Sequence, residues 1–402
     1  MKSQKTVAWF SMSEIQFSPK INMLTSLLRS ALTGTECEGS CSPKEWAKVY
    51  AFAAQQSVVG LAYRGISFLP AANRPSLEFL LQWASEAETI HGHNRLLNEV
   101  AARLTKIFAD KGFRSAILKG PANARLYPDP FARQCGDIDI WVEGGQQKVL
   151  DLLQSLGMYK SLPKISWYDY KTYRKELYNR FQSFSRHHIH LNQKIDGVSV
   201  EVHFRPSSAI NNPIANKKLQ RYLEKEIETT EFVGDGFYVP SVKFALVMQL
   251  AHIQHHFFEL GIGLKQLIDY YVLLQKVSEK DRVEASSMIR QVGLYRIATA
   301  VMWVLEYIFK LDQQKMLCEP NSKLGMVLLQ DVFKGGSFGS YAPRHNRGAF
   351  VKWVARMHRP LQLLMFDPIE VFWSFISNWV EFMRLIPVRI KLRKLSLKGY
   401  WA

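Results

Sequence analysis

Residues 118–142 read Leu118-Lys-Gly-Pro-Ala-Asn-Ala-Arg-Leu-Tyr-Pro-Asp-Pro-Phe-Ala-Arg-Gln-Cys-Gly-Asp-Ile-Asp-Ile-Trp-Val142. Alternation over Asp137–Val142 predicts a strand in which Asp137 and Asp139 point to one face and the isoleucines point into a core. Adjacent carboxylates repel each other, and a divalent cation such as Mg²⁺, which binds carboxylate and phosphate oxygens, is their usual compensation. The stretch therefore predicts a metal site, with two solvated aspartates at a strand end as the alternative.

The segments on either side of this strand complete a small sheet. Residues 115–120 are typical of a short strand that runs into a glycine turn. Residues 188–193 and 198–204 flank Asp196-Gly197, a dipeptide that favours a tight hairpin turn. The second of these strands places Glu201 between core valines, where it is the natural third carboxylate for the metal site.

The rest of the chain has the periodicity of helices, so we expect an α+β fold. A small mixed-sheet core over 112–240 is flanked by a helical N-terminal lead-in over 1–111 and a helical domain over 241–334. A basic, aromatic segment follows over 335–402. The expected helices include 44–65, 76–111, 121–127, 146–156, 242–260, 264–277, 280–291 and 295–311.

Composition excludes several classes of protein. The 402 residues are 47% hydrophobic and 22% charged, which is typical of a globular chain and not of a disordered or collagenous one. Four cysteines are too few for a disulfide scaffold and favour reduced thiols. The charge-free run 371–380 is too short to span a bilayer, so we expect a cytoplasmic protein.

The C-terminal segment is strongly basic. Residues 344–402 contain eleven Lys or Arg and three Asp or Glu, a net +8 within a total of +17. Between Ile369 and Ile386 apolar residues recur at helical spacing, and Pro387 is expected to end that helix. Such a segment predicts contact with an anionic membrane, at the inner membrane face, or with a polyanion; a terminal helix docked on the core is the alternative.

Four motifs together resemble a known family. They are Leu118-Lys-Gly120, Leu126-Tyr127, Arg133-x-x-Gly-Asp-Ile-Asp-Ile-Trp-Val142 and Val200-Glu-Val-His203. The pattern resembles the bacterial uncharacterised nucleotidyltransferase family, within the DNA polymerase β-type nucleotidyltransferase superfamily. The resemblance covers about 45–275.

The resemblance implies a Mg²⁺-dependent enzyme that moves a nucleoside monophosphate from an NTP such as ATP to a hydroxyl acceptor. The acceptor is a glycan, a metabolite, a protein or RNA, and the family's usual context favours surface polysaccharide biosynthesis. The implied catalytic and metal-binding residues, for two Mg²⁺ ions, are Asp137, Asp139 and Glu201. The implied nucleotide-binding residues are Lys119, Gly120, Arg133, Gly136, His203 and Lys265.

Histidines offer a rival metal site that we do not expect to be catalytic. His252 and His256 share a helix face, but no acid stands between them where a zinc protease needs one. We expect His203, His252 or His256 either to form hydrogen bonds near the nucleotide pocket or to pack in the core. Asp269 is a candidate to orient such a histidine.

Two readings compete with the enzyme. The first is a catalytically silent nucleotide-binding module, against which the intact carboxylate set argues. The second is a peripheral membrane or polyanion adaptor that acts through its basic C-terminus. The aromatic and basic stretch 167–181 suits either a ring-stacking insertion or an amphipathic helix.

Overall fold

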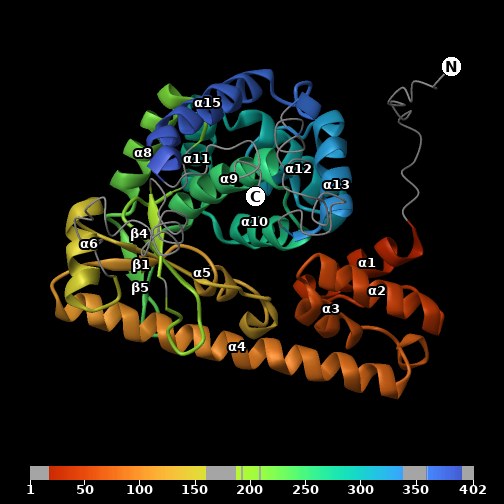
Figure 1. The fold of residues 1–402 in the computed structure, drawn as a ribbon. Helices are drawn as coiled ribbons and strands as arrows, with labels where there is room; N and C mark the ends of the chain where they lie inside the picture. Colours follow the sequence, from red (N-terminus) through yellow and green to blue (C-terminus); the bar gives the residue numbers. More distant parts are fainter. Residues whose placement is uncertain are drawn as a thin grey trace.

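The computed structural model describes residues 18–159, 187–191, 193–207, 210–337, 359 and 361–391. The stretch 167–181 therefore lies outside the described residues. The fold is α+β, as predicted, with helices around a small mixed sheet (Figure 1). Before the sheet come α1 (Pro19–Thr33), α2 (Pro43–Gln55), α3 (Val59–Ile66) and α4 (Leu77–Asp110).

The main sheet has the strand order β1-β2-β4-β3. Strand β2 pairs parallel with β4 and antiparallel with β1, and β3 pairs antiparallel with β4. Asp196 and Gly197 both have positive φ and lie inside the Ile195–Val198 bridge, which confirms the predicted hairpin turn. The elements are β1 (Ser115–Ile117), α5 (Pro121–Ala124), β2 (Ile138–Val142), α6 (Gly145–Ser155), β3 (His188–His190) and β4 (Val200–His203).

Helices dominate the remainder of the chain. Helix α8 (Pro213–Glu226) and the two-stranded sheet β5 (Thr230–Phe232) and β6 (Tyr238–Pro240) were not predicted. The later helices are α9 (Val242–Glu259), α10 (Leu264–Lys276), α11 (Glu279–Gln291), α12 (Tyr295–Phe309), α13 (Ser322–Gly335) and α15 (Pro368–Lys391).

Helix α4 joins two hydrophobic cores. Its first half supplies Trp83 to a core shared by the N-terminal helices and the helices after β6. Its second half supplies Leu97, Leu104 and Phe108 to the core beneath the sheet. Figure 1 shows this long helix running under both parts of the molecule. The division at 111, 240 and 334 stays a prediction.

Two predicted helix boundaries are wrong. The helix expected over 44–65 is two helices, because Ser57 adopts a left-handed φ of 55° between them. The adjacent Gln56 donates to the Val332 carbonyl at 3.0 Å and accepts from the Leu264 amide at 2.9 Å, so long-range contacts hold the break. Helix α15 also runs past Pro387 to Lys391, since a proline removes one helical hydrogen bond without forbidding the helix.

Candidate functional site

The candidate site begins where β2 lies beside β4. The register pairs Asp139 with Glu201 on neighbouring parallel strands, so their side chains lie on the same face of the sheet. Asp137 comes directly before β2, two residues from Asp139. Hydrophobic residues at 138, 140, 200 and 202 are buried in the opposite face and fix this register.

Gly120 shapes the turn between β1 and α5. Its φ of 64° and ψ of −112° are accessible only to glycine without strain. A Cβ atom at this position would lie 2.9 Å from the carbonyl oxygen of Asp137. The glycine therefore lets the turn approach the carboxylate strand.

We expect Gly120→Ala to lower the free energy of unfolding by about 2 kcal/mol, because the backbone strain of a positive φ adds to the steric clash of the new Cβ with the Asp137 carbonyl oxygen. Gly136→Ala is the matched control, since a Cβ there meets nothing within 4 Å and its φ is not positive. That variant should change stability by less than about 0.5 kcal/mol. Urea unfolding measures both, and equal losses would contradict the assigned role of Gly120.

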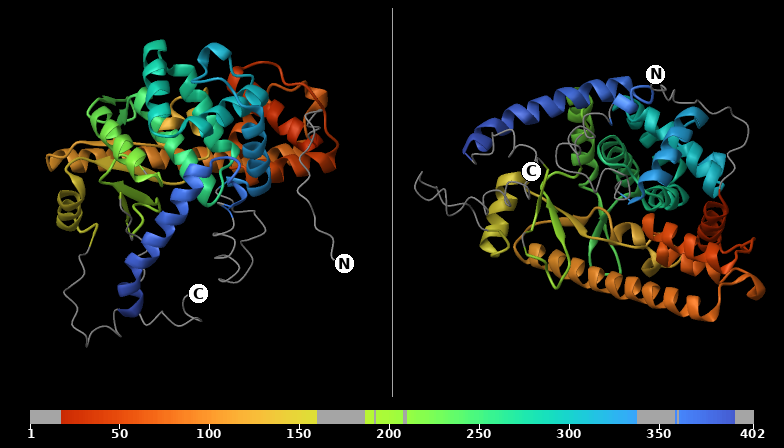
Figure 2. Two further views of the ribbon diagram at one scale, coloured as in Figure 1. Left: turned by 90° about the horizontal axis from the view of Figure 1, so that it is seen from above. Right: turned by 45° about the vertical axis from the view of Figure 1, so that its right-hand side comes forward.

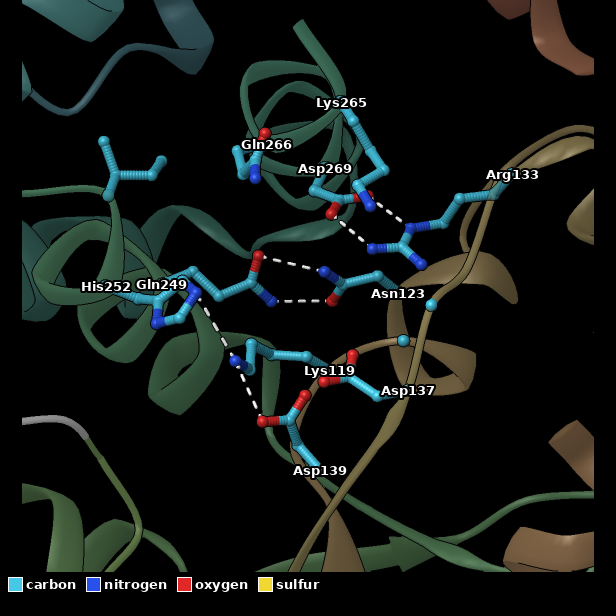
Figure 3. Close-up of a pocket in the computed structure, with 13 residues that line it drawn as sticks. Lys119, Asn123, Arg133, Asp137, Asp139, Gln249, His252, Lys265, Gln266 and Asp269 are labelled. Atoms are coloured by element: carbon cyan, nitrogen blue, oxygen red, sulfur yellow. Dashed lines mark hydrogen bonds and ion pairs between the residues drawn. The ribbon is translucent and has the colours of Figure 1, made fainter. Parts of the chain in front are cut away.

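A pocket opens between the sheet and helices α9 and α10 (Figure 3). The β1–α5 turn and the segment before β2 form one wall, and the two helices form the other. The lining residues are Lys119, Gly120, Asn123, Arg133, Gly136, Asp137, Asp139, Gln249, His252, Ile253, Lys265, Gln266 and Asp269. Seven of the nine predicted site residues line this pocket. The other two lie beside Asp139: Glu201 is opposite it on β4, and His203 Nε2 is 3.1 Å from its Oδ1.

Lys119 is a cation that lies beside the carboxylates. Its Nζ lies 2.9 Å from Asp139 Oδ1 and 3.4 Å from His252 Nε2 (Figure 3). Burial alone would lower the pKa of Lys119, but the charges of Asp139, Asp137 and Glu201 outweigh it and raise the pKa. Burial and the Lys119 charge lower the pKa of His252, so it accepts from Lys119 as a neutral ring.

Asp139 and Asp137 differ in their surroundings. Burial would raise the pKa of Asp139, but Lys119 and the hydrogen bond from His203 Nε2 at 3.1 Å hold it well below its usual range. Burial and then the charge of Asp139 raise the pKa of Asp137 to about 6. Additional positive charge beside Asp137 would therefore favour its ionised form.

A buried ion pair joins the sheet side of the pocket to α10. Arg133 Nε and Nη2 each donate at 2.6 Å to the two oxygens of Asp269, and Tyr127 donates to Oδ1 at 2.7 Å. The hydrogen-bond partners of Asp269 among the described residues are Arg133 and Tyr127, so the prediction that it orients a histidine is wrong. Burial and the charge of Arg133 lower the pKa of neighbouring Lys265.

One further feature of the pocket was missed from the sequence. Asn123 and Gln249 exchange two amide hydrogen bonds, of 3.1 and 2.6 Å, and so connect α5 to α9 (Figure 3). The available signal was Gln249 itself, a lone amide inside the apolar run 244–251. Nothing in the sequence pointed to its partner 126 residues earlier.

The donor set suits a hard divalent cation. One ligand atom each from Asp139, Glu201 and His203 lie within 4.8 Å of one another, and Asp137 lines the same pocket without belonging to that group. Carboxylate oxygens are the ligands that Mg²⁺ prefers, and Asp137, Asp139 and Glu201 supply them at one place in the fold. The residues present therefore fit Mg²⁺.

Comparison with known proteins identifies a family and finds similar solved structures. The model of the family described as uncharacterised nucleotidyltransferase matches residues 42–310. A crystal structure of an antigenic nucleotidyltransferase-like protein from Paracoccidioides brasiliensis is similar over 56% of this chain and 95% of its own, with 14% identity and a TM-score of 0.28. No curated protein matches the sequence.

Proposed function

The chain belongs to the uncharacterised nucleotidyltransferase family, and from that premise we propose that it moves a nucleoside monophosphate from an NTP to a hydroxyl acceptor. The observation that supports this most is the juxtaposition of Asp139 with Glu201 across parallel strands, beside Asp137 and Lys119. The set combines acidic ligands for a cation with a basic group for phosphate, which is what phosphoryl transfer requires.

In the proposed reaction the acceptor oxygen attacks the α-phosphorus as the bond to the bridging oxygen breaks. Pyrophosphate leaves, and the hydroxyl proton passes to solvent. Asp137, Asp139 and Glu201 would hold Mg²⁺, which when bound neutralises phosphate charge. We propose two ions, as in the two-metal class of transferases.

The other residues position the NTP. The turn at Gly120 brings backbone close to the phosphates, and Lys119 and Lys265 supply positive charge beside them. His203 holds Asp139 in place through its hydrogen bond. Arg133 lines the pocket, but its guanidinium donates two hydrogen bonds to Asp269. We therefore propose that it fixes α10 over the site as well as facing the nucleotide.

The test of this proposal supplies each α-labelled NTP with Mg²⁺ and a lysate of the source cells to the purified protein. We expect label to appear on a glycan, a metabolite, a protein or RNA, and the family's context favours a glycan of surface polysaccharide biosynthesis. Mg²⁺-dependent NTP binding without transfer would support the silent module instead. The absence of both transfer and binding would contradict the proposal.

A second candidate function rests on α15. Its first turns are anchored, since Glu370 accepts from Asn211 at 2.8 and 3.2 Å and Val371 is buried. Its outer face is exposed and apolar, and Figure 2 shows the helix extending away from the body of the protein. The exposed side chains are Ile369, Phe372, Ile376, Trp379, Val380 and Met383.

We propose that this face lies on an anionic membrane surface. Residues 384–402 add Arg384, Arg389, Lys391, Arg393, Lys394 and Lys398 without any acidic residue. Apolar burial and attraction to anionic lipid act together in such helices. Among the helices that the structure describes, none has the length and apolar content needed to cross a bilayer.

We expect Phe372→Glu/Val380→Glu to weaken binding to phosphatidylserine vesicles by at least about tenfold, because each change puts a charge into the apolar face. Vesicle co-sedimentation measures the effect. Leu77→Glu/Leu81→Glu on α4 is the matched control, since those leucines are at least as exposed and lie on a different helix. Equal loss in both double variants, or none in either, would contradict a docking role for α15.

A further inference from the structure

Strands β3 and β4 carry, on one face, four side chains of types that can bind a metal ion. The register opposes His188 to His203 and His190 to Glu201. Residues directly opposite each other share a face of the sheet, as do residues two apart along one strand. His188, His190, Glu201 and His203 therefore form a block, and β3 is an edge strand of the described sheet.

Three of these side chains are close enough to share one ion. His188 Nε2 lies 3.2 Å from His190 Nε2 and 3.7 Å from Glu201 Oε2, and His190 Nδ1 lies 3.1 Å from Glu201 Oε1. One ligand atom from each of the three lie within 4.8 Å of one another. Ligands at about 2.1 Å from a tetrahedral ion are about 3.4 Å apart, so small side-chain rotations would complete the site.

We propose that His188, His190 and Glu201 bind a divalent transition-metal ion such as Zn²⁺. Imidazole nitrogen suits zinc and its neighbours in the transition series, whereas Mg²⁺ prefers oxygen ligands. The site is reachable from solvent, because the His190 side chain is 48% exposed and those of His188 and Glu201 are 15% and 16% exposed. Water can fill a fourth position on that open side.

This ion differs from the Mg²⁺ of the proposed function in ligands and in place. Glu201 belongs to both sets, since its Oε2 also lies 3.6 Å from His203 Nε2 on the catalytic side. Occupancy of the histidine site would thus engage a carboxylate that the proposed transfer also uses. Metal binding at the histidine site requires neither a nucleotide nor transfer, so it can be tested independently of the proposed function.

The experiment titrates Co²⁺, and Zn²⁺ in competition, into full-length protein freed of metal by chelation and dialysis. We expect one equivalent of Co²⁺ to give the visible absorption bands of a four-coordinate ion, and Zn²⁺ to abolish them. His190→Ala should weaken Co²⁺ binding by at least about tenfold. His190 is exposed, so this variant should fold, and its far-UV circular dichroism checks that it does.

His255→Ala is the matched control, because it removes a histidine that also faces a glutamate, Glu259, at 3.5 Å. Co²⁺ binding should be unchanged in this variant. Unchanged binding in His190→Ala would overturn the proposal. Binding lost in Asp137→Asn but kept in His190→Ala would also overturn it, since the ion would then lie with the aspartates. If Co²⁺ binds as expected but the protein transfers no NMP, this inference is supported and the proposed function is contradicted.

Discussion

Asp137→Asn is expected to lower the rate of NMP transfer by about 10³-fold, because it removes one of the carboxylates proposed to hold Mg²⁺. Cations at such sites supply several kcal/mol of transition-state stabilisation, and about 4 kcal/mol corresponds to that factor. Initial rates with a labelled NTP at saturating Mg²⁺ measure the change. A loss smaller than tenfold would contradict a catalytic role for Asp137.

The same variant should fold at least as well as the parent. Burial and the nearby charge of Asp139 disfavour the ionised form of Asp137, as its raised pKa shows, so a neutral amide relieves an unfavourable interaction. We expect an equal or higher melting temperature. Asp151→Asn on the exposed face of α6 is the control, and it should change neither the rate nor the melting temperature.

Asp269→Asn is expected to lower the free energy of unfolding by about 3–5 kcal/mol, because it leaves the Arg133 guanidinium buried without its counterion. Both side chains of this pair are only 6% exposed. Glu143→Gln is the matched control, since Arg114 binds Glu143 with the same fork at 2.7 and 2.8 Å but on the surface. That change should cost about 1 kcal/mol or less.

A double variant separates the effect of the unpaired charge on stability from the effect of lost packing. Arg133→Leu/Asp269→Leu should cost less than Asp269→Asn alone, because no unpaired charge remains buried. Urea unfolding at neutral pH compares the two. A double variant less stable than the single one would contradict the assignment of the loss to an unpaired charge.

The ion pair also predicts the direction of a pH dependence. Burial would raise the pKa of Asp269, but Arg133 outweighs it and lowers the pKa below the unfolded value of about 3.9. The pair's contribution to stability is therefore fully present above about pH 4 and is lost as pH falls through the folded pKa. Asp269→Asn should lack this part of the acid transition.

Much of the candidate site follows from local sequence. The alternation of Asp137 and Asp139 predicted one strand face, and the hairpin dipeptide Asp196-Gly197 predicted the strand that carries Glu201; both strands are confirmed. These features depend on neighbours a few residues away, since the two-residue period of a strand and the positive φ of a turn are local properties. Their roles in catalysis stay predictions.

Other features depend on segments that only packing brings together. The sequence alone determined the strands of the main sheet, most of the helices and the strand face that carries Asp137 and Asp139, because short-range periodicity and backbone sterics specify them. The resemblance to the family supplied the other predicted residues of the pocket. Only the tertiary structure decided that Asp269 binds Arg133, that Gln249 binds Asn123 and that the chain breaks at Ser57. Those choices rest on contacts between residues more than a hundred positions apart. Hydrophobic burial of α9 and α10 in the core that they share with the N-terminal helices creates these contacts, and no local pattern encodes them.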